Sequence, residues 1–523
     1  MGNREKKTAV RTVGLVMIIM FIGKMTGLLR EIVLNSRLSP EMSERIAFDP
    51  SLTVPQQFLD FAFAAALSSS FIPVFNHYLE KKGKKEAFNL ANQFITGVLI
   101  ISVLITAFAM IFSPQIINLT SKMPDRETFD LAVSLFRVIL PMMILTAAAF
   151  SLTGVLQSLG EFNIPAAMSV LSNIIIIFYF IFFFDKFGVF GAAVVFLIGW
   201  ATQIIVQIPS LRKRGYVFKP DFKFKNEGIK EIGLLMIPVI VSTWVQPINT
   251  LVNGRVASNL YNGAGRPALS SAGVVYAVIT GVFILSISNV IFPKLSKLTA
   301  IDDHEGFAIT INSTLRVTAF MLIPMSVGLI LLGEPLIRVI YERGDFTEIS
   351  TSYASKALIF YAAGMVGLGF QTILSRAFYA LKDAKTPLIT AIIAMAVNAF
   401  ASVALVGKLE IGGPALAASL SITLVGVIML FAMRRRDKRS FDASALISLV
   451  KMAVCAVLMG VCVYFTGKFI PWQSSSDADF ITNVIALAVP IAVGILVYFV
   501  SATVLRIDEA LLVFRKVAGK VRK

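Results

Sequence analysis

Long apolar runs are the feature that most constrains how this chain can fold. They recur along the 523 residues, of which 56% are hydrophobic and only 15% are charged. The mean hydropathy of +0.79 is far above what a water-exposed surface permits. A helix of about 20 apolar residues crosses the roughly 30 Å of hydrocarbon in a bilayer and satisfies its own backbone hydrogen bonds there. The runs therefore predict an all-α polytopic membrane protein.

Fourteen runs are predicted to be transmembrane helices, as two groups of six and a final pair. The expected spans lie near residues 13–33, 52–77, 88–112, 130–157, 163–185, 187–211, 229–256, 268–293, 308–332, 352–381, 386–407, 411–433, 444–469 and 480–504. The first run is too long for a signal peptide and lacks a small-residue cleavage site. We expect it to remain as a membrane helix.

Lysine and arginine residues cluster in the short segments between the runs, and the cytoplasmic side of a membrane retains such residues. Clusters before the first span, at Lys81–Lys85, between Arg212 and Lys230, and at Arg434–Arg439 all fall on one predicted side, as does the basic C-terminal tail. Both termini are therefore predicted to be cytoplasmic. This topology explains the formal net charge of +17 better than nucleic-acid binding does.

An internal repeat relates the two groups of six spans. Pro73, Pro114, Pro165 and Gly191 correspond to Pro293, Pro335, Pro387 and Gly413, with successive spacings of 41, 51 and 26 against 42, 52 and 26 residues. Because six is an even number, both copies enter from the same side, as parallel repeats. We expect an N-terminal lobe over 1–215, a C-terminal lobe over 216–437, and two additional helices with a basic tail over 438–523. This arrangement favours alternating-access transport.

Ionisable residues in the first span are the leading candidates for substrate binding, because a charge at the bilayer centre costs about 2.5–3.5 kcal/mol. Lys24, Gly27 and Glu31 share one helical face, and Arg30 lies about one helical step away. The pattern predicts a mixed-charge stripe that faces a polar cavity. The alternative is that Arg30 and Glu31, near the end of the span, extend to the membrane interface.

Other ionisable residues interrupt later spans. Asp60 in the second span and Arg255 near the end of the seventh are further binding candidates. The alternatives are a structural ion pair for Asp60 and contact with outer head groups for Arg255. Arg316 and Arg376 lie nearer the cytoplasmic ends, where we expect the side chains to extend toward the interface.

The sequence contains little that indicates catalysis. His77 and His304 lie at predicted helix ends, and neither they nor the cysteines Cys455 and Cys462 have a metal-ligand spacing. No Gly-x-x-x-x-Gly-Lys-Ser/Thr motif is present. We therefore expect a transporter that is not an enzyme and that has no defined cofactor or metal.

Four motifs carry a resemblance to a known family. They are Gly27-Leu28-Leu29-Arg30-Glu31, Glu161-Phe162-x-x-Pro165-Ala166, Glu342-Arg343-Gly344-Asp345-Phe346, and Phe378-Tyr379-Ala380-x-x-Asp383-x-Lys385-Thr386-Pro387. With them, nearly the whole chain resembles the MurJ/MviN lipid II flippases of the MOP exporter superfamily. The resemblance implies a bacterial inner-membrane protein that carries the lipid-linked peptidoglycan precursor to the outer leaflet and works beside cell-wall synthesis proteins. It also implies that Lys24 and Arg30 occupy positions of cavity arginines, with Glu31 at the neighbouring acid.

The chain departs from the family pattern at three places. The helix-two arginine of the family falls at Leu59, its Ala-Glu-Gly-Ala motif at Phe63 to Ala66, and its helix-eight arginine near Val274. Arg255, one helix earlier, is a candidate replacement for a lost cation. Some relatives are thought to couple transport to sodium or to membrane potential, and Asn249 and Asn398 are the polar candidates for an ion site.

Two alternative functions follow from these observations. One is an exporter of another polyprenyl-linked saccharide or amphipathic molecule. The other is a transport-inactive membrane scaffold, because the family's arginines are missing. A membrane-embedded enzyme would need convergent acids or histidines at the membrane surface, and the sequence suggests none. The expected partners are an anionic lipid-linked substrate and the bilayer, without nucleic acid.

Overall fold

The computed structural model describes residues 3–66, 70–469 and 480–511. Inside these ranges, the side chains of residues 3–14, 17, 58–66, 238, 241–242, 285–286, 289 and 480 are not described. The described ranges consist of α-helices, short 3-10 turns and connecting loops, without a β-strand. The chain divides into two compact units, residues 1–267 and 268–523.

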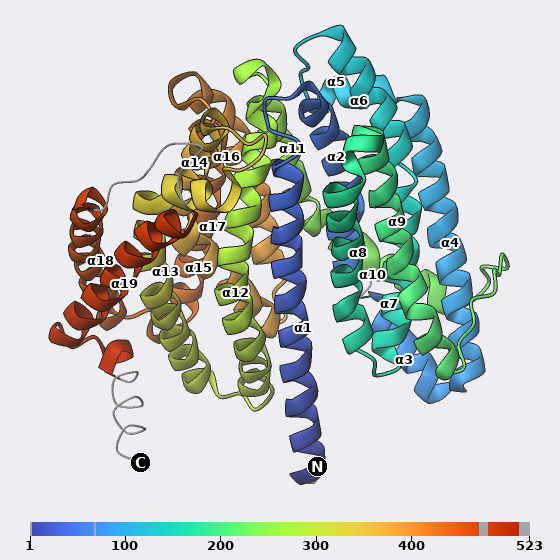
Figure 1. Ribbon diagram of the computed structural model, residues 1–523. Coiled ribbons are helices and arrows are strands. Elements are labelled where there is room, and N and C mark those ends of the chain that lie inside the picture. The colour runs from blue at the N-terminus through green and yellow to red at the C-terminus, as the bar shows by residue number, and fades with distance from the viewer. Residues whose placement is uncertain (1–2, 67–69, 470–479, 512–523) are drawn as a thin grey trace. The chain divides into compact units, whose positions relative to one another are not determined.

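The first unit is a bundle of long helices. In chain order they are α1 (Asn3–Asn35), α2 (Ser43–Ala66), α3 (Ile72–Lys81), α4 (Gly83–Ile111), α5 (Ser113–Thr120), α6 (Arg126–Ile139), α7 (Met142–Ser158), α8 (Asn163–Phe182), α9 (Phe184–Lys213), α10 (Glu227–Thr243) and α11 (Val245–Ala257) (Figure 1). The 3-10 turn η2 (Tyr261–Gly263) then leads into α12 (Gly265–Ala300), most of which belongs to the second unit.

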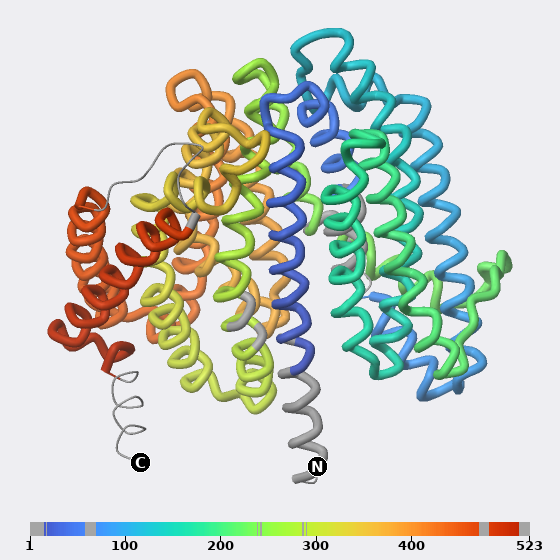
Figure 2. Tube along the Cα trace, viewed as in Figure 1, coloured from blue at the N-terminus to red at the C-terminus, as the bar shows by residue number. Residues whose placement is uncertain are grey.

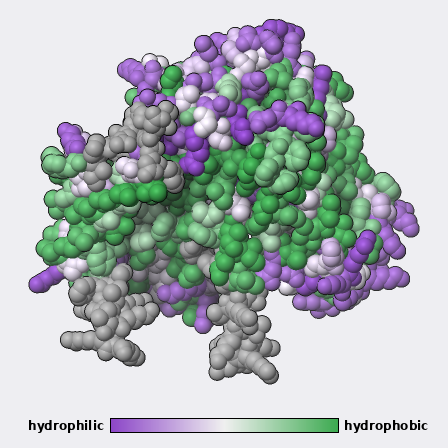
Figure 3. Space-filling view, in the orientation of Figure 1, coloured by the Kyte–Doolittle hydropathy of each residue, from purple (hydrophilic) through white to green (hydrophobic). Residues whose placement is uncertain are grey.

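Helix packing in the first unit buries aromatic side chains. α1 packs on α8, α8 on α9, α2 on α6, and α7 on both α4 and α9. Phe48, Phe136, Phe180 and Phe196 are almost completely buried in this core. On the part of this unit that Figure 3 shows, hydrophobic residues form a band between hydrophilic ends. That pattern is typical of helices surrounded by lipid.

The second unit contains the rest of α12 and the later helices. They are α13 (His304–Tyr341), α14 (Glu348–Ala362), α15 (Met365–Ala380), α16 (Lys385–Leu409), α17 (Gly412–Arg436), the 3-10 turn η3 (Lys438–Ser440), α18 (Ala443–Phe469) and α19 (Phe480–Val504). α17 packs on α14, α15 and α16, while α18 and α19 pack on each other and on α13. Tyr341, Phe346 and Phe378 are among its fully buried side chains.

Each of the fourteen predicted spans coincides with a helix or with two consecutive helices, which confirms the all-α membrane architecture. Among the described residues, ten helices are long and apolar enough to cross a membrane, or eleven if the α14–α15 pair, bent by 48°, counts as one span. The other predicted spans correspond to α1, to α2 with α3, and to α10 with α11. The number of spans therefore stays a prediction.

The internal repeat appears in the backbone at pairs of positions that lie 222 residues apart. Gly160 and Lys382 both have positive φ, at 78° and 59°, immediately before corresponding helices. Gly188 and Glu410 also share positive φ, at 56° and 50°. Both copies of the repeat therefore place a residue with positive φ shortly before one helix, α8 or α16, and another shortly after its end.

An ion pair recurs at the same offset. In the first unit Arg214 Nη2 lies 2.7 Å from Glu161 Oε2, and in the second unit Arg436 pairs with Asp383. The acids belong to two of the motifs that carried the family resemblance. In both copies the pair ties the loop before one helix to the end of the next.

The boundary between the compact units differs from the predicted boundary between the lobes. The units divide after Pro267, because α10 and α11 pack against α2 in the first unit. The predicted lobes at 1–215 and 216–437 follow the sequence repeat, whereas the compact units follow the packing of the helices. They stay a prediction, as does the separate segment 438–523.

Candidate functional site

Small residues bring α1 close to α8. A Cβ atom added at Gly23 would lie 3.0 Å from Ser169 Oγ, and one at Gly27 would lie 3.6 Å from Asn173 Nδ2. The Asn173 amide donates to the Gly23 carbonyl at 3.5 Å and to Thr26 Oγ1 at 3.3 Å. Asn173 on α8 therefore holds the middle of α1 in place.

Arg30 lies on the α8 and α9 side of α1. Its Nη1 donates to Asn173 Oδ1 at 3.2 Å, and its guanidinium carbon lies 5.5 Å from the ring centroid of Phe196. An amide oxygen and an aromatic face stabilise a cation without neutralising it. The side chain is half-buried, so a positive group is held in a fixed position against the bundle.

Lys24 has a different environment. It is exposed near the middle of the predicted span 13–33, and it forms no hydrogen bond or ion pair with another described residue. An ammonium group at this depth needs water or an anion, because hydrocarbon does not solvate it. Lys24 is thus the described α1 side chain that is best placed to meet an anionic ligand.

Glu31 is buried in an ion pair rather than displayed to a cavity. Arg45 Nη2 lies 2.8 Å from Glu31 Oε1, and the side chains are only 3% and 9% exposed, respectively. The predicted stripe therefore does not form a single exposed set. Lys24 faces outward from its helix, Arg30 contacts α8 and α9, and Glu31 neutralises an arginine at the start of α2.

The remaining predicted site residues are not joined to this group by any described contact. Asp60 lies in α2, but its side chain is outside the described residues, as are those of Leu59 and residues 63–66. Arg255, in the last turn of α11, donates to Asn259 Oδ1 at 3.4 Å. Among the described side chains, no hydrogen bond or ion pair links Arg255 with Lys24 or Arg30.

A second buried ion pair in the first unit was not predicted. Arg266 Nε lies 3.0 Å from Asp49 Oδ1, with side chains only 3% and 5% exposed, and Arg266 Nη1 also donates to the Thr120 carbonyl. Gly254 permits this arrangement, since a Cβ atom there would lie 3.1 Å from the guanidinium. The residues lie between predicted spans, so their positions suggested loops. The spacing of Arg45 and Asp49, one helical turn apart, was the available signal.

The two arginines of the second unit that are expected to extend toward the interface, Arg316 and Arg376, have protein partners. Arg316 Nη2 donates to Asp508 Oδ2 at 2.7 Å and to Glu509 Oε2 at 3.2 Å, which fastens the segment after α19 to α13. Arg376 Nε donates to Ser288 Oγ at 3.2 Å, and its guanidinium lies 5.5 Å from the centroid of Phe292. These contacts do not test whether either side chain extends toward the interface, so that expectation stays a prediction.

The two asparagines named as polar candidates are buried in different units. Asn249 on α11 is 8% exposed, and its Oδ1 has no hydrogen-bond partner among the described residues. Asn398 on α16 is fully buried with neither amide atom bonded, and Ser402 Oγ, one turn later, also has no described partner. Buried polar atoms normally have partners, so these oxygens suit water or a hard cation.

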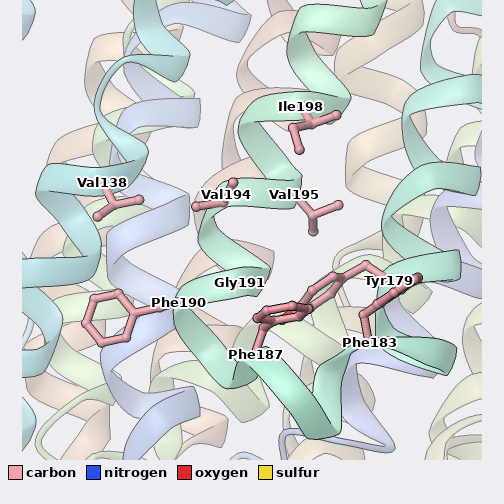
Figure 4. Close-up of a pocket in the computed structure, with 9 residues that line it drawn as sticks. All are labelled: Val138, Tyr179, Phe183, Phe187, Phe190, Gly191, Val194, Val195 and Ile198. Carbon is pink, nitrogen blue, oxygen red and sulfur yellow. The ribbon is translucent and has the colours of Figure 1, made fainter.

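An open groove of about 520 Å³ lies on another part of the first unit. Figure 4 shows Phe183 and Phe187 at one end, with Phe190 and Val194 of α9 facing Val138 of α6. The lining is aromatic and aliphatic, so it suits hydrocarbon rather than an anionic head group. Among the predicted binding residues with described side chains, none lines this groove.

The sequence model of the family described as "Lipid II flippase MurJ" matches residues 47–498. A protein of Rickettsia prowazekii named "Probable lipid II flippase MurJ" is 24% identical over 491 residues, which cover 93% of this chain and 96% of the relative. A protein of Haemophilus influenzae with the same name is 26% identical over 499 residues, covering 91% and 96%.

Solved structures show the same relationship. The structure titled "Lipid II flippase MurJ, inward closed conformation" is 27% identical with a TM-score of 0.78, covering 94% of this chain and 99% of that one. An inward-facing MATE transporter of the MOP superfamily, 18% identical, shares the fold with a TM-score of 0.69, covering 81% and 98%. Because the family model matches far more than half of this chain, the chain belongs to the lipid II flippase MurJ family.

Proposed function

We propose that this protein carries lipid II, a lipid-linked sugar head group with a pyrophosphate, from the inner to the outer leaflet by alternating access. The head group is anionic and strongly hydrated, so it cannot cross hydrocarbon unaided. The polyprenyl tail can remain in the bilayer throughout. The protein therefore has to supply a polar path with positive charge and does not have to carry out a chemical reaction.

The observation that carries this proposal is the exposed ammonium group of Lys24 in the middle of a membrane-length helix. No described acidic side chain neutralises it, and a charge at that depth is costly without a partner. A pyrophosphate provides that partner when it passes. Lys24 is a compact point charge on a flexible stem, which suits a transient contact.

In this proposal Arg30 is the second cation, and Asn173 positions it. A guanidinium binds phosphate oxygens through two parallel hydrogen bonds, and its contact with Phe196 leaves its positive charge in place. Glu31 and Arg45 neutralise each other and have a structural role. Asp60 and Arg255 remain candidate substrate-binding residues on the basis of sequence alone.

Complementation in cells tests the choice of substrate. In a bacterium depleted of its own lipid II flippase, the intact chain is expected to restore growth and cell shape. Lys24→Ala is expected to fail at equal membrane abundance, whereas Lys24→Arg, which keeps the charge, is expected to retain function. Failure of the intact chain together with restored export of another polyprenyl-linked glycan would favour the alternative exporter. Equal growth with the intact chain, Lys24→Ala and Lys24→Arg would contradict the role of Lys24.

The transport-inactive scaffold predicts a different outcome. A scaffold would restore growth only where a second flippase is present, and Lys24→Ala would not change that result. Depleting the resident flippase in strains with and without this chain therefore separates the two functions. The missing arginine at Leu59 is the feature that keeps the scaffold in consideration.

We further propose that transport needs no organic cofactor and is driven by a sodium gradient or by membrane potential. Asn398 and Ser402 each offer an oxygen without a described partner, and oxygen ligands suit a hard cation. Asn398→Leu is expected to abolish sodium-dependent stabilisation against heat, with Asn312→Leu as a control, which removes a half-buried amide on α13 that donates to the Arg439 carbonyl. If sodium stabilises neither the intact chain nor the variants, membrane potential remains as the driving force.

The proposed setting is the bacterial inner membrane, with both termini in the cytoplasm. The distribution of lysine and arginine supports this orientation. Contacts with cell-wall synthesis proteins belong to the same proposal. Accessibility of a cysteine placed at Lys438 to a membrane-impermeant reagent tests the orientation, since protection in intact cells and labelling in inverted vesicles are expected.

A further inference from the structure

The segment between α9 and α10, residues 214–226, runs back along α4 as an extended chain, and we name it the strap. It is the irregular green segment beside the lower half of α4 in Figures 1 and 2. The sequence indicated only a basic loop here. The structure shows a segment that forms hydrogen bonds and an ion pair with neighbouring segments at both ends and in its middle.

Polar side chains on α4 hold the middle of the strap. Asn92 Oδ1 accepts from the Tyr216 hydroxyl at 2.9 Å and from the Lys219 backbone N–H at 3.2 Å. Thr96 Oγ1 accepts from the Asp221 backbone N–H at 3.0 Å, and the Gln93 amide donates to Asp221 Oδ2 at 2.8 Å. The hydrogen bond from Gln93 and the N–H of Lys223 hold the pKa of the Asp221 carboxyl below its ordinary value.

The ends of the strap are fixed as well. Arg214 pairs with Glu161 at one end, and at the other the Tyr78 hydroxyl donates to Asn226 Oδ1 at 2.7 Å. Phe224 adopts positive φ, at 41°, and its ring lies 3.2 Å from where a Cβ of Gly97 would be. These contacts fix the strap at both ends and place the Phe224 ring against α4.

The outer side of the strap alternates positive and apolar side chains. Lys219, Lys223 and Lys225 are exposed, and between them Phe222 and Phe224 are 68% and 41% exposed. The one acid of the strap, Asp221, is engaged by Gln93. A soluble loop would have no reason to display two phenylalanines between three lysines.

The depth of the strap follows from its position on α4. The strap contacts α4 between Asn92 and Gly97, whereas the large exposed apolar side chains of α4 begin at Ile100 and continue to Ile111. Those exposed residues face the hydrocarbon. With a rise of about 1.5 Å per residue, the strap lies within a few residues of the boundary between head groups and acyl chains.

We propose that the strap is a binding surface for anionic phospholipids in the leaflet at this end of the bundle. The lysines bind lipid phosphates, while Phe222 inserts between the upper acyl carbons, as aromatic residues do at membrane interfaces, and Phe224 lies between this surface and α4. The surface holds the connection between the two sequence repeats against the membrane. This role is independent of the transported substrate and so goes beyond the proposed function.

Lipid retention by the intact protein tests the charge contribution. The triple variant Lys219→Ala/Lys223→Ala/Lys225→Ala removes three exposed lysines, none of which holds the fold through a side-chain bond in the described structure. The control Arg434→Ala/Arg435→Ala/Lys438→Ala removes the same charge from exposed positions at the end of α17 and in η3. Each protein is purified from equimolar phosphatidylglycerol and phosphatidylcholine, and its bound lipid is measured by native mass spectrometry.

The preference for phosphatidylglycerol is expected to fall roughly fivefold for each strap lysine removed. The control is expected to lose less, because no aromatic side chain alternates with its basic residues between Arg434 and Lys438. Equal retention by the intact protein and the strap variant overturns the proposal. So does equal loss in both triple variants, since this would mean that only total charge matters.

Insertion depth provides a second and independent test. Phe222→Trp in nanodiscs with acyl-brominated phosphatidylglycerol is expected to show extra quenching beyond that of the native tryptophans, measured by difference from the intact protein. The triple lysine variant in the same background is expected to lose much of that quenching. An unquenched tryptophan places the strap in water and overturns the proposal, leaving a soluble acidic partner as the explanation of the patch.

Discussion

Two arginines in the first unit are almost completely removed from solvent, each beside a carboxylate. Arg45 pairs with Glu31, and Arg266 pairs with Asp49. Burying such ions costs several kcal/mol each, and the attraction between partners offsets this only while both are present. These arginines therefore have a structural role, whereas Lys24 is exposed and Arg30 is held by Asn173 and Phe196.

Glu31→Gln is expected to lower the free energy of unfolding by about 3–5 kcal/mol, because the buried Arg45 guanidinium loses its counter-charge. Denaturant unfolding in detergent micelles measures this. The double variant Glu31→Gln/Arg45→Met is expected to recover much of the loss. The exposed pair Arg37–Asp185, with side chains 38% and 76% exposed, is the control, and its removal is expected to cost at most about 1 kcal/mol. Similar losses at both pairs would contradict the structural role of Glu31.

The turns between helices α8 and α9 and between α16 and α17 provide a comparison at the scale of elements. Gly188 has φ 56° and ψ −152°, a region that glycine enters freely. Its repeat equivalent is Glu410, with φ 50° and ψ −128°, where a side chain is strained. The same backbone conformation is therefore adopted by the favoured glycine in the first copy and by a glutamate in the second.

Glu410→Gly is expected to raise the free energy of unfolding by about 1 kcal/mol, because relief of backbone strain outweighs the loss of the exposed contact with Lys356. Thermal unfolding of the purified protein measures the shift. Glu410→Gln removes the same charge but keeps the strain, so it is expected to be neutral or slightly destabilising. A lower stability for Glu410→Gly than for Glu410→Gln would show that the turn is not strained.

The repeated ion pairs Glu161–Arg214 and Asp383–Arg436 are expected to contribute similarly. Each is partly exposed, so double-mutant cycles with alanine are expected to give coupling energies of about 1 kcal/mol. Arg126–Asp130, with side chains 83% and 58% exposed, is expected to give less than half of that. Negligible coupling in only one of the repeated pairs would contradict their equivalence.

At the scale of the whole molecule, the sequence predicted the helices well because lipid imposes a simple rule on each span. Apart from the short helix α5, apolar length alone located the described helices and helix pairs, and recurring prolines and glycines located the repeat. Partners far apart in sequence were not predictable in this way. Asp49 and Arg266 lie 217 residues apart, and the packing of α11 against α2 and α5 brings them together.

The candidate site was predicted in part. The sequence placed Lys24 and Arg30 inside a span. Residues on one helical face can still differ in burial, so the pattern did not show that the Glu31 carboxylate is buried while Lys24 is exposed. Glu31 differs from Lys24 because it pairs with Arg45, and Arg45 lies in the segment before the second predicted span, where the sequence suggested a loop. The strap was read as a basic loop for the same reason, since its order depends on Asn92, Gln93 and Thr96 of α4.

Positive side chains on α1 are proposed to carry an anionic lipid head group through the membrane. Proteoliposomes that contain the purified protein and fluorescent lipid II test this role through the fraction of lipid II that becomes accessible to an enzyme added outside. Rapid exposure is expected with the intact protein and with Lys24→Arg, and at least tenfold slower exposure with Lys24→Ala, equivalent to about 1.4 kcal/mol of lost stabilisation. Equal rates for Lys24→Ala and the intact protein would contradict this role.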